Sequence, residues 1–306
     1  MSDPLSGAFF AVLASTSWAA GACFARLGMQ QVGSRTGTFI SLAAGFVIIS
    51  VVAWSMDSQA LFAVSGSTVL WFALLGLIQF PGGRFLNYTG IRLAGVARTT
   101  SISGTSPLFA ALLAILFLGE QVTSSLVLGT LAVAVGLALV MSQRGAFPST
   151  QSQEVQPSGT RRVAIGLLCA VAGAAAYGTG HAIARHVVTR VAPAPVTATY
   201  TLFFGMLFLL VISVPHLKRD LRAPRSALIM MILAGVCSSF GIFLMYTALA
   251  RAPVMLASPI VATYPLIAMT FTHIFLQRLE RVTLRMALGA ILVAVGITFV
   301  VLGQAG

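Results

Sequence analysis

"SPLFAALLAILFLGE" (residues 106–120) and "YPLIAMTFTHIFLQRLE" (residues 264–280) are the two stretches from which the fold can be worked out. Each has a proline at its second position, continues as an apolar run of about three helical turns and ends at a carboxylate, Glu120 or Glu280. The whole chain has only six acidic residues. Because acidic residues are so rare in this chain, two copies of a pattern that ends at a carboxylate indicate an internal duplication.

The composition around these stretches identifies lipid as the main solvent of the chain. Of the 306 residues, 58% are hydrophobic and 8% are charged, whereas soluble proteins carry about 25% charged residues. So few charges cannot cover a surface exposed to water, which excludes a soluble domain. The net charge of +12 comes from arginines that stand singly or in pairs between apolar runs. This placement indicates membrane topology signals rather than a nucleic-acid surface.

Ten apolar segments are each long enough to cross a hydrocarbon core of ~30 Å as a helix. Their approximate limits are 7–27, 37–55, 67–89, 95–118, 124–142, 162–187, 195–214, 225–249, 255–276 and 283–303. No alternation of the barrel type appears, so a helical bundle is predicted. The polar stretch 143–161 is rich in Ser, Gln, Pro and Gly. It is predicted to be a flexible linker between two five-helix units, residues 1–142 and 162–306.

The two units align when the second is shifted back by about 159 residues. The matched pairs include Trp18 with Tyr177, Gly83 with Gly241, Pro107 with Pro265 and Glu120 with Glu280. Because each unit has an odd number of spans, the two copies must lie antiparallel in the membrane. The predicted fold is therefore an all-α membrane protein with ten transmembrane helices in two inverted five-helix repeats. Secondary transporters use this plan, with the binding site between the repeats.

The chain as a whole resembles the EamA-type branch of the drug/metabolite transporter superfamily. The resemblance rests on the ten spans, the two five-helix repeats and the proline-started helix that ends in "LGE" at residues 118–120. It implies transport of a small organic solute by export or exchange. The second copy departs from the pattern, with "LQRLE" in place of "LGE". Glu120 and Glu280 are expected to be structural groups at the membrane interface.

Basic residues are concentrated in the connections on one side of this bundle. Thirteen of them lie there: Arg26, Arg35, Arg92, Arg144, Arg161, Arg162, Lys218, Arg219, Arg222, Arg225, Arg278, Arg281 and Arg285. The opposite side holds three, Arg185, Arg190 and Arg251. The positive-inside rule therefore predicts an inner-membrane protein with both termini in the periplasm. The family resemblance implies cytoplasmic termini instead, and the prediction follows the charges.

The stretch "QFPGGRFLNYTG" in the third span is the most unusual in the chain. Pro81 removes a backbone donor and Gly82 and Gly83 weaken the helix, so a hinge or helix break is predicted here. Arg84 follows at once, and a charge inside a span is a candidate for function. The matching residue of the second repeat is Ile242. Two explanations stay open for Arg84: it binds an anion in a cavity, or it snorkels to an interface ~8 Å away.

Other polar and aromatic residues inside the spans are candidates for a cavity between spans one, three, four, six, eight and nine. His181 either binds substrate or carries a proton, or it is a neutral imidazole bonded to a neighbouring helix. Tyr177 and Trp18 either line the cavity or pack helices together. The predicted substrate-binding residues are Trp18, Arg84, Asn87, Tyr88, Tyr177, His181, Tyr246 and Tyr264, and Pro107 and Pro265 are further predicted hinges.

The sequence contains no phosphate loop, metal-ligand spacing or catalytic constellation. No catalytic residue, cofactor or metal is therefore predicted, and the chain is not expected to be an enzyme. We predict a secondary transporter that moves a small polar metabolite across the inner membrane by alternating access. The charge predicted inside a span is cationic, so the solute is expected to be anionic or zwitterionic, amino acids included. The expected partners are this solute and the lipid bilayer, with no nucleic acid, and a monomer is the expected state.

Two other classes of function remain as alternatives to a transporter. One is a membrane-embedded enzyme or a carrier of lipid head groups, which the missing catalytic constellation disfavours. The other is a membrane sensor that transports nothing, which the absence of a soluble input or output domain disfavours. Flux of a substrate into sealed vesicles separates these classes.

Overall fold

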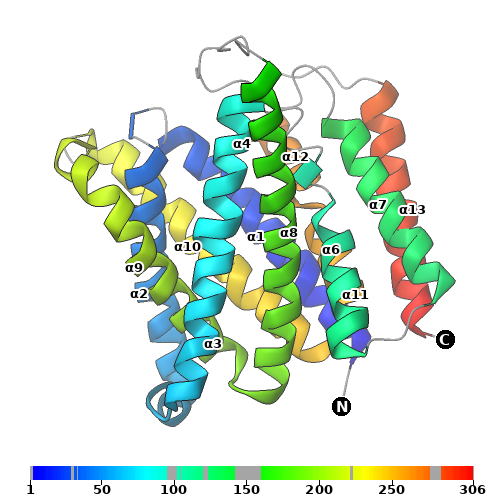
Figure 1. Ribbon diagram of the computed structural model, residues 1–306, viewed down its shortest axis with the longest axis horizontal. Helices are drawn as coiled ribbons and strands as arrows, with labels where there is room; N and C mark the ends of the chain where they lie inside the picture. Colours follow the sequence, from blue (N-terminus) through cyan, green and yellow to red (C-terminus); the bar gives the residue numbers. More distant parts are fainter. Residues whose placement is uncertain are drawn as a thin grey trace.

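The computed structural model describes residues 3–28, 31–32, 34–94, 102–103, 105–119, 123–141, 160–220, 223–275 and 284–305, which form a bundle of helices (Figure 1). The first repeat contains α1 (Pro4–Gly28), α2 (Ser34–Phe62), α3 (Gly66–Leu77), η1 (Ile78–Phe85), α4 (Leu86–Ala94), α6 (Ser106–Leu113), η2 (Ala114–Leu118) and α7 (Ser124–Met141). The second contains α8 (Thr160–Arg190), α9 (Ala194–Asp220), α10 (Arg225–Arg251), α11 (Val254–Val261), α12 (Tyr264–Phe275) and α13 (Leu284–Ala305).

The predicted crossings of the membrane are present in the part of the chain that the structure describes. Six helical stretches are long and apolar enough, by length and composition, to cross a bilayer. Four shorter apolar stretches complete the ten crossings: Ser106–Leu118, Ser124–Leu139, Val254–Ala268 and Ile291–Val300. Most of the predicted linker lies outside the described residues, as do Glu120 and Glu280.

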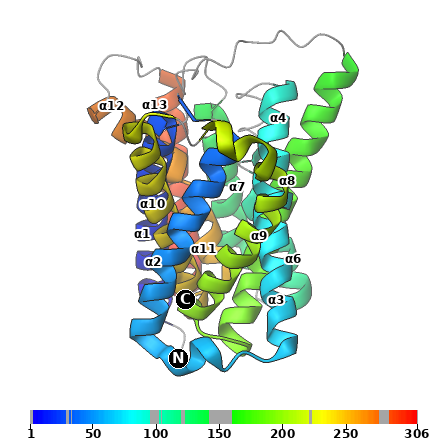
Figure 2. The ribbon, with the colours of Figure 1, turned by 90° about the vertical axis from the view of Figure 1, so that its left-hand side faces the viewer.

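The two repeats are inverted relative to each other, as predicted. Both termini lie at the same end of the bundle, and α1 runs away from that end whereas its counterpart α8 runs toward it (Figure 1). The packing follows the same symmetry, because α1 packs on α10 while α8 packs on η1 and α4. The helices α2 and α9 pair with each other on one face of the bundle (Figure 2), and α7 pairs with α13.

The expected break in the third crossing takes the form of a π-helical segment, η1. The helix does not stop at Pro81 but continues through Ile78–Phe85 into α4. A proline ring needs space beside the carbonyl group four residues earlier, and a π-helical turn is wider than an α-helical one. The wider turn therefore carries Pro81 through the crossing without ending the helix.

The other two predicted hinges lie at matching helix starts in the two repeats. Pro107 is the second residue of α6, and Pro265 is the second residue of α12. A short turn at Ala262 and Thr263 separates α11 from α12. The ninth crossing is therefore built from two helices, with Pro265 directly after the interruption.

Gly119 of the "LGE" phrase ends the fourth crossing. Its φ angle is 65°, in the left-handed region that glycine adopts without the steric cost of a side chain. Its backbone N–H donates to the carbonyl oxygen of Ala114. The glycine of the motif thus has a local structural role as a helix C-cap.

Two contacts between the repeats depend on the absence of a side chain at glycine. The ring of Tyr177 on α8 lies against Gly83, where an added Cβ atom would be 2.6 Å from Cε1 of the tyrosine. The indole of Trp18 on α1 lies against Gly241 of α10 in the same way. These four residues are two of the pairs matched in the sequence. The same ring-on-glycine contact therefore occurs once on each side of the pseudo-two-fold axis.

Replacing Gly83 by alanine tests this contact. Because the new methyl group must displace the Tyr177 ring, Gly83→Ala should lower the free energy of unfolding by about 1–3 kcal/mol. The neighbouring Gly82→Ala is a matched control, since its Cβ atom would lie 3.4 Å from the nearest side-chain atom, Cβ of Ala176. It should be neutral or slightly stabilising. Unfolding of the purified protein in detergent measures both variants, and equal effects would contradict the contact.

Candidate functional site

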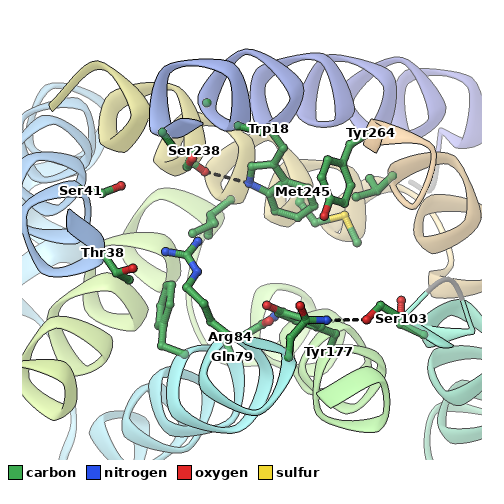
Figure 3. A pocket seen from close by; sticks show the side chains of 18 of the residues that line it. Trp18, Thr38, Ser41, Gln79, Arg84, Ser103, Tyr177, Ser238, Met245 and Tyr264 are labelled. Carbon is green, nitrogen blue, oxygen red and sulfur yellow. Dashed lines mark hydrogen bonds between the residues drawn. The ribbon is translucent and has the colours of Figure 1, made fainter. Parts of the chain in front are cut away.

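A cavity of about 280 Å³ lies between the two repeats (Figure 3). Its walls include apolar residues and a large set of polar or aromatic ones: Trp18, Thr38, Ser41, Gln79, Arg84, Asn87, Ser103, Ser106, Tyr177, His181, Thr201, Ser238, Tyr246 and Tyr264. The lining comes from the six predicted spans and, in addition, from the second and seventh, through α2 and α9. The cavity is therefore shared by both repeats.

The structure brings most of the sequence-predicted site residues to this one cavity. Seven of them line it: Trp18, Arg84, Asn87, Tyr177, His181, Tyr246 and Tyr264. The eighth, Tyr88, belongs to the helical backbone of α4, and its side chain lies outside the described part of the structure. Their role in binding a substrate stays a prediction.

The cavity extends from the middle of the bundle toward the end opposite the termini. Thr38 near the start of α2 and Ser103 before α6 contribute to the wall on that side. At the terminal side, α11 packs against α1, α6, α8 and α10, and all eight of its residues are buried. Helix α11 therefore forms a closed floor beneath the cavity.

Arg84 extends from its helix into the cavity (Figure 3). Its Cζ atom lies 5.4 Å from the ring centroid of Phe80, which is buried and lies four residues earlier, toward the middle of the membrane. The helix continues to Ala94, ten residues beyond Arg84, or ~15 Å. The apolar stretch of this crossing that is long enough to span a bilayer, Gly66–Phe85, ends one residue after Arg84. The guanidinium lies over the Phe80 ring in the cavity wall, and its role as an anion site rather than a snorkelling group stays a prediction.

The charge of Arg84 faces a cavity wall without a carboxylate. None of the residues that the structure describes as lining the cavity is acidic. Phe80 offers the face of its ring, which attracts a cation but accepts no strong hydrogen bond. The guanidinium donors are therefore directed at the space that a solute would occupy.

His181 connects the cavity to its floor. Its Nδ1 atom lies 3.1 Å from Oγ of Ser258 on α11, and both side chains are buried. This hydrogen bond joins α8 to α11 and leaves Nε2 as the other polar atom of the ring. The bond to a neighbouring helix that was considered for His181 is thus present, and its contact with a substrate stays a prediction.

Two further predicted residues are held by hydrogen bonds across helices. Nε1 of Trp18 donates to the carbonyl oxygen of Ser238 over 2.8 Å, and Nδ2 of Asn87 donates to Oγ of Ser103. The ring of Tyr264 meets the indole of Trp18 edge-on, with 6.2 Å between centroids. These contacts position the aromatic part of the cavity wall.

Sequence reasoning missed several polar residues of the wall, namely Thr38, Ser41, Gln79, Ser103, Ser106, Thr201 and Ser238. Gln79 carried a readable signal, because it is an amide inside an apolar span, two residues before Pro81. The serines and threonines carried none. Such residues are common in membrane helices, where their hydroxyl groups often bond to the carbonyl groups of their own helix.

Two inverted five-helix repeats around a shared cavity are the plan of a membrane transporter. The sequence profile of the EamA-like transporter family matches this chain twice, over residues 5–142 and 164–302. The chain therefore belongs to the EamA-like transporter family and, with it, to the drug/metabolite transporter superfamily.

Individual relatives agree with this assignment. A protein from a Sinorhizobium species, described as an uncharacterized transporter in the cobO 3' region, is 31% identical over 134 residues. The match covers 43% of this chain and 94% of that protein, which thus has about the length of one repeat. A crystal structure with 16% sequence identity superposes with a TM-score of 0.78 and covers 98% of both chains. At that identity the likeness shows the fold.

The hydrogen bond between His181 and Ser258 can be tested by Ser258→Ala. Loss of the hydroxyl leaves a buried imidazole nitrogen without its partner, so the free energy of unfolding should fall by about 1–2 kcal/mol. In a His181→Asn background the same substitution should cost less. Thr298→Ala is the control, because the Thr298 hydroxyl is exposed and bonds to its own helix. Additive effects of the two substitutions would contradict the link.

Proposed function

We propose that this chain is a secondary transporter that carries a small amphipathic organic anion or zwitterion by alternating access. The observation that supports it is the guanidinium of Arg84, which faces a cavity between the repeats whose described lining contains no carboxylate. A charge inside the membrane is costly, and such residues are usually functional. Arginine also binds carboxylate, phosphate and sulfonate groups through two parallel hydrogen bonds.

The opposite repeat supports the amphipathic character of the solute. Ile242, which matches Arg84 in the alignment of the repeats, lines the same cavity together with Met231 and Met245. One wall therefore presents a cation and the other presents branched and flexible apolar side chains. A solute with an anionic head and an apolar body is complementary to both walls.

The inverted relation between the repeats supports alternating access. In this conformation α11 of the second repeat closes the terminal side of the cavity. Because the repeats are inverted copies, exchanging their conformations would close the opposite end and open this one. The solute would then pass from one side to the other while it stays bound between the repeats.

The proposed location is the inner membrane, with both termini in the periplasm. The described helix ends that the basic connections join lie away from the termini (Figure 1), and the positive-inside rule assigns that end to the cytoplasm. The cavity extends toward the same end. In this conformation it would therefore extend toward the cytoplasmic side.

Substitution of Arg84 tests the anion site. If the guanidinium holds an anionic group, Arg84→Lys should lose much of the transport, because lysine cannot make two parallel bonds, and Arg84→Ala should lose nearly all of it. The measurement begins with a thermal-stability screen of the purified protein against organic anions and amino acids. Flux of the stabilising compound into sealed vesicles is then compared per molecule of inserted protein.

Arg251 provides the matched control for this experiment. It also lies over an aromatic ring, 4.5 Å from the centroid of Phe10, but it is exposed at the end of α10 and does not line the cavity. Arg251→Ala should therefore transport at the wild-type rate. Full activity of Arg84→Lys together with substantial activity of Arg84→Ala would remove Arg84 from the site and end the preference for anionic solutes.

Reporter fusions at Gly306 test the orientation. Because the terminal end of the bundle carries few basic residues, an alkaline phosphatase fusion should be active and a green fluorescent protein fusion should be dark. The reverse result, a silent phosphatase with a bright fluorescent fusion, would place the termini in the cytoplasm. It would leave the fold and the cavity unchanged.

A further inference from the structure

Two buried hydroxyl groups in the wall of the cavity have no hydrogen-bond partner. They belong to Tyr246 on α10, whose exposed fraction is 1%, and to Thr201 on α9, whose exposed fraction is 0%. Both residues line the cavity between the repeats. An unpaired hydroxyl in an apolar interior costs free energy, so this pair needs an explanation.

The same chain shows how these residue types are usually satisfied. Thr199, two residues before Thr201 on α9, donates to the carbonyl oxygen of Pro195 over 2.9 Å, and Thr247 donates to that of Phe243. The hydroxyl of Tyr200 donates to the carbonyl oxygen of Leu61 over 3.0 Å. A third unpaired hydroxyl, that of Thr130 on α7, lies away from the cavity. What needs explaining is therefore that two hydroxyl groups without a partner lie in the wall of the same cavity.

A neutral amide from the first repeat joins them. Gln79 of η1 lines the same cavity, and its side chain and that of Thr201 are polar neighbours of the Tyr246 hydroxyl outside hydrogen-bonding geometry. The amide of Gln79 lies against Gly180 of α8, where an added Cβ atom would be 2.6 Å from Nε2. The missing side chain at Gly180 thus makes room for the amide. Three neutral polar groups from α9, α10 and η1 converge on one part of the cavity.

The cluster of Gln79, Thr201 and Tyr246 and the side chain of Arg84 lie at different depths in the cavity. Gln79 precedes Arg84 by five residues on the same crossing, about one turn of the π-helical segment η1. The third crossing starts at the terminal end of the bundle, so Gln79 lies nearer the closed floor than Arg84 does. The cavity thus has a cationic group above and a neutral hydrogen-bonding cluster below.

We propose that Gln79, Thr201 and Tyr246 form a second subsite, which binds a neutral hydrogen-bonding group of the solute whose anionic end is held by Arg84. This inference rests on the proposed function and narrows its substrate class to anions that also carry a hydroxyl or amide group at a distance from the charge. A solute with that group satisfies the unpaired hydroxyls. A solute without it leaves them unpaired, and such sites discriminate strongly against the analogue that lacks the bond.

Two matched pairs of compounds probe the subsite. They are 3-(4-hydroxyphenyl)propionate with 3-phenylpropionate, and 6-hydroxyhexanoate with hexanoate, which differ within each pair by one distal hydroxyl. Calorimetric dissociation constants for the purified full-length protein should be about tenfold lower for the hydroxylated member, a difference of about 1.4 kcal/mol. Tyr246→Phe and Thr201→Val should each remove this difference within both pairs.

The protein without added solute supplies a second measurement. Tyr246→Phe removes no protein hydrogen bond, so its melting temperature should equal or exceed that of the wild type. Tyr200→Phe is the matched control, because its hydroxyl bonds to Leu61 and Tyr200 lies outside the cavity. That variant should melt at a lower temperature and keep the preference for the hydroxylated compounds.

Three results would overturn the subsite: a loss of melting temperature in Tyr246→Phe as large as in Tyr200→Phe, binding of neither hydroxylated compound, or equal binding within both pairs. If the hydroxyls of Thr201 and Tyr246 only bind water, the two compounds of each pair would bind with equal affinity. Arg84→Ala separates this failure from failure of the anion site. If Arg84→Ala weakens the binding of both members of a pair equally, the anion site is supported whether or not the subsite exists. If it weakens neither, the anion site itself fails.

Discussion

The contact of an aromatic ring with a glycine backbone, made twice between the repeats, is the interaction on which the arrangement of this bundle depends. Lipid is as apolar as the side chains, so helices in a membrane associate through close packing and small residues rather than by escaping water. Gly83 and Gly241 let Tyr177 and Trp18 reach across to the opposite repeat. Both rings also line the cavity. The packing that joins the repeats therefore also shapes the wall between them.

The duplication sets the scaffold, and the differences between the copies set the chemistry. In the first repeat the third crossing contains the π-helical segment with Pro81 and then Arg84. In the second repeat the matching helix α10 is continuous from Arg225 to Arg251 and has Ile242 in that place. π-Helical segments inside helices often occur at functional sites. Here the segment contains Arg84, the charge that the proposed transport depends on.

The candidate site could be predicted in part, for reasons that individual residues make clear. Arg84 and His181 were recognisable because polar side chains inside apolar spans are costly and therefore rare. The third crossing was predicted to end at residue 89, where hydropathy falls, whereas the helix continues to Ala94. Polar residues there can remain helical because α4 packs against α8. Hydropathy measures the affinity of a segment for lipid and does not register a helix end that a neighbouring helix covers.

The sequence by itself determined that the chain crosses the membrane ten times and that its two halves are inverted copies. Composition and an odd number of spans per copy are properties of the chain alone. Only the tertiary structure decided which side chains face the cavity. These helices are apolar around most of their circumference, so periodicity does not reveal the inward face. Thr199 and Thr201 look alike in the sequence, yet one hydroxyl bonds to its own helix and the other has no partner at the cavity, because helix packing differs at the two positions.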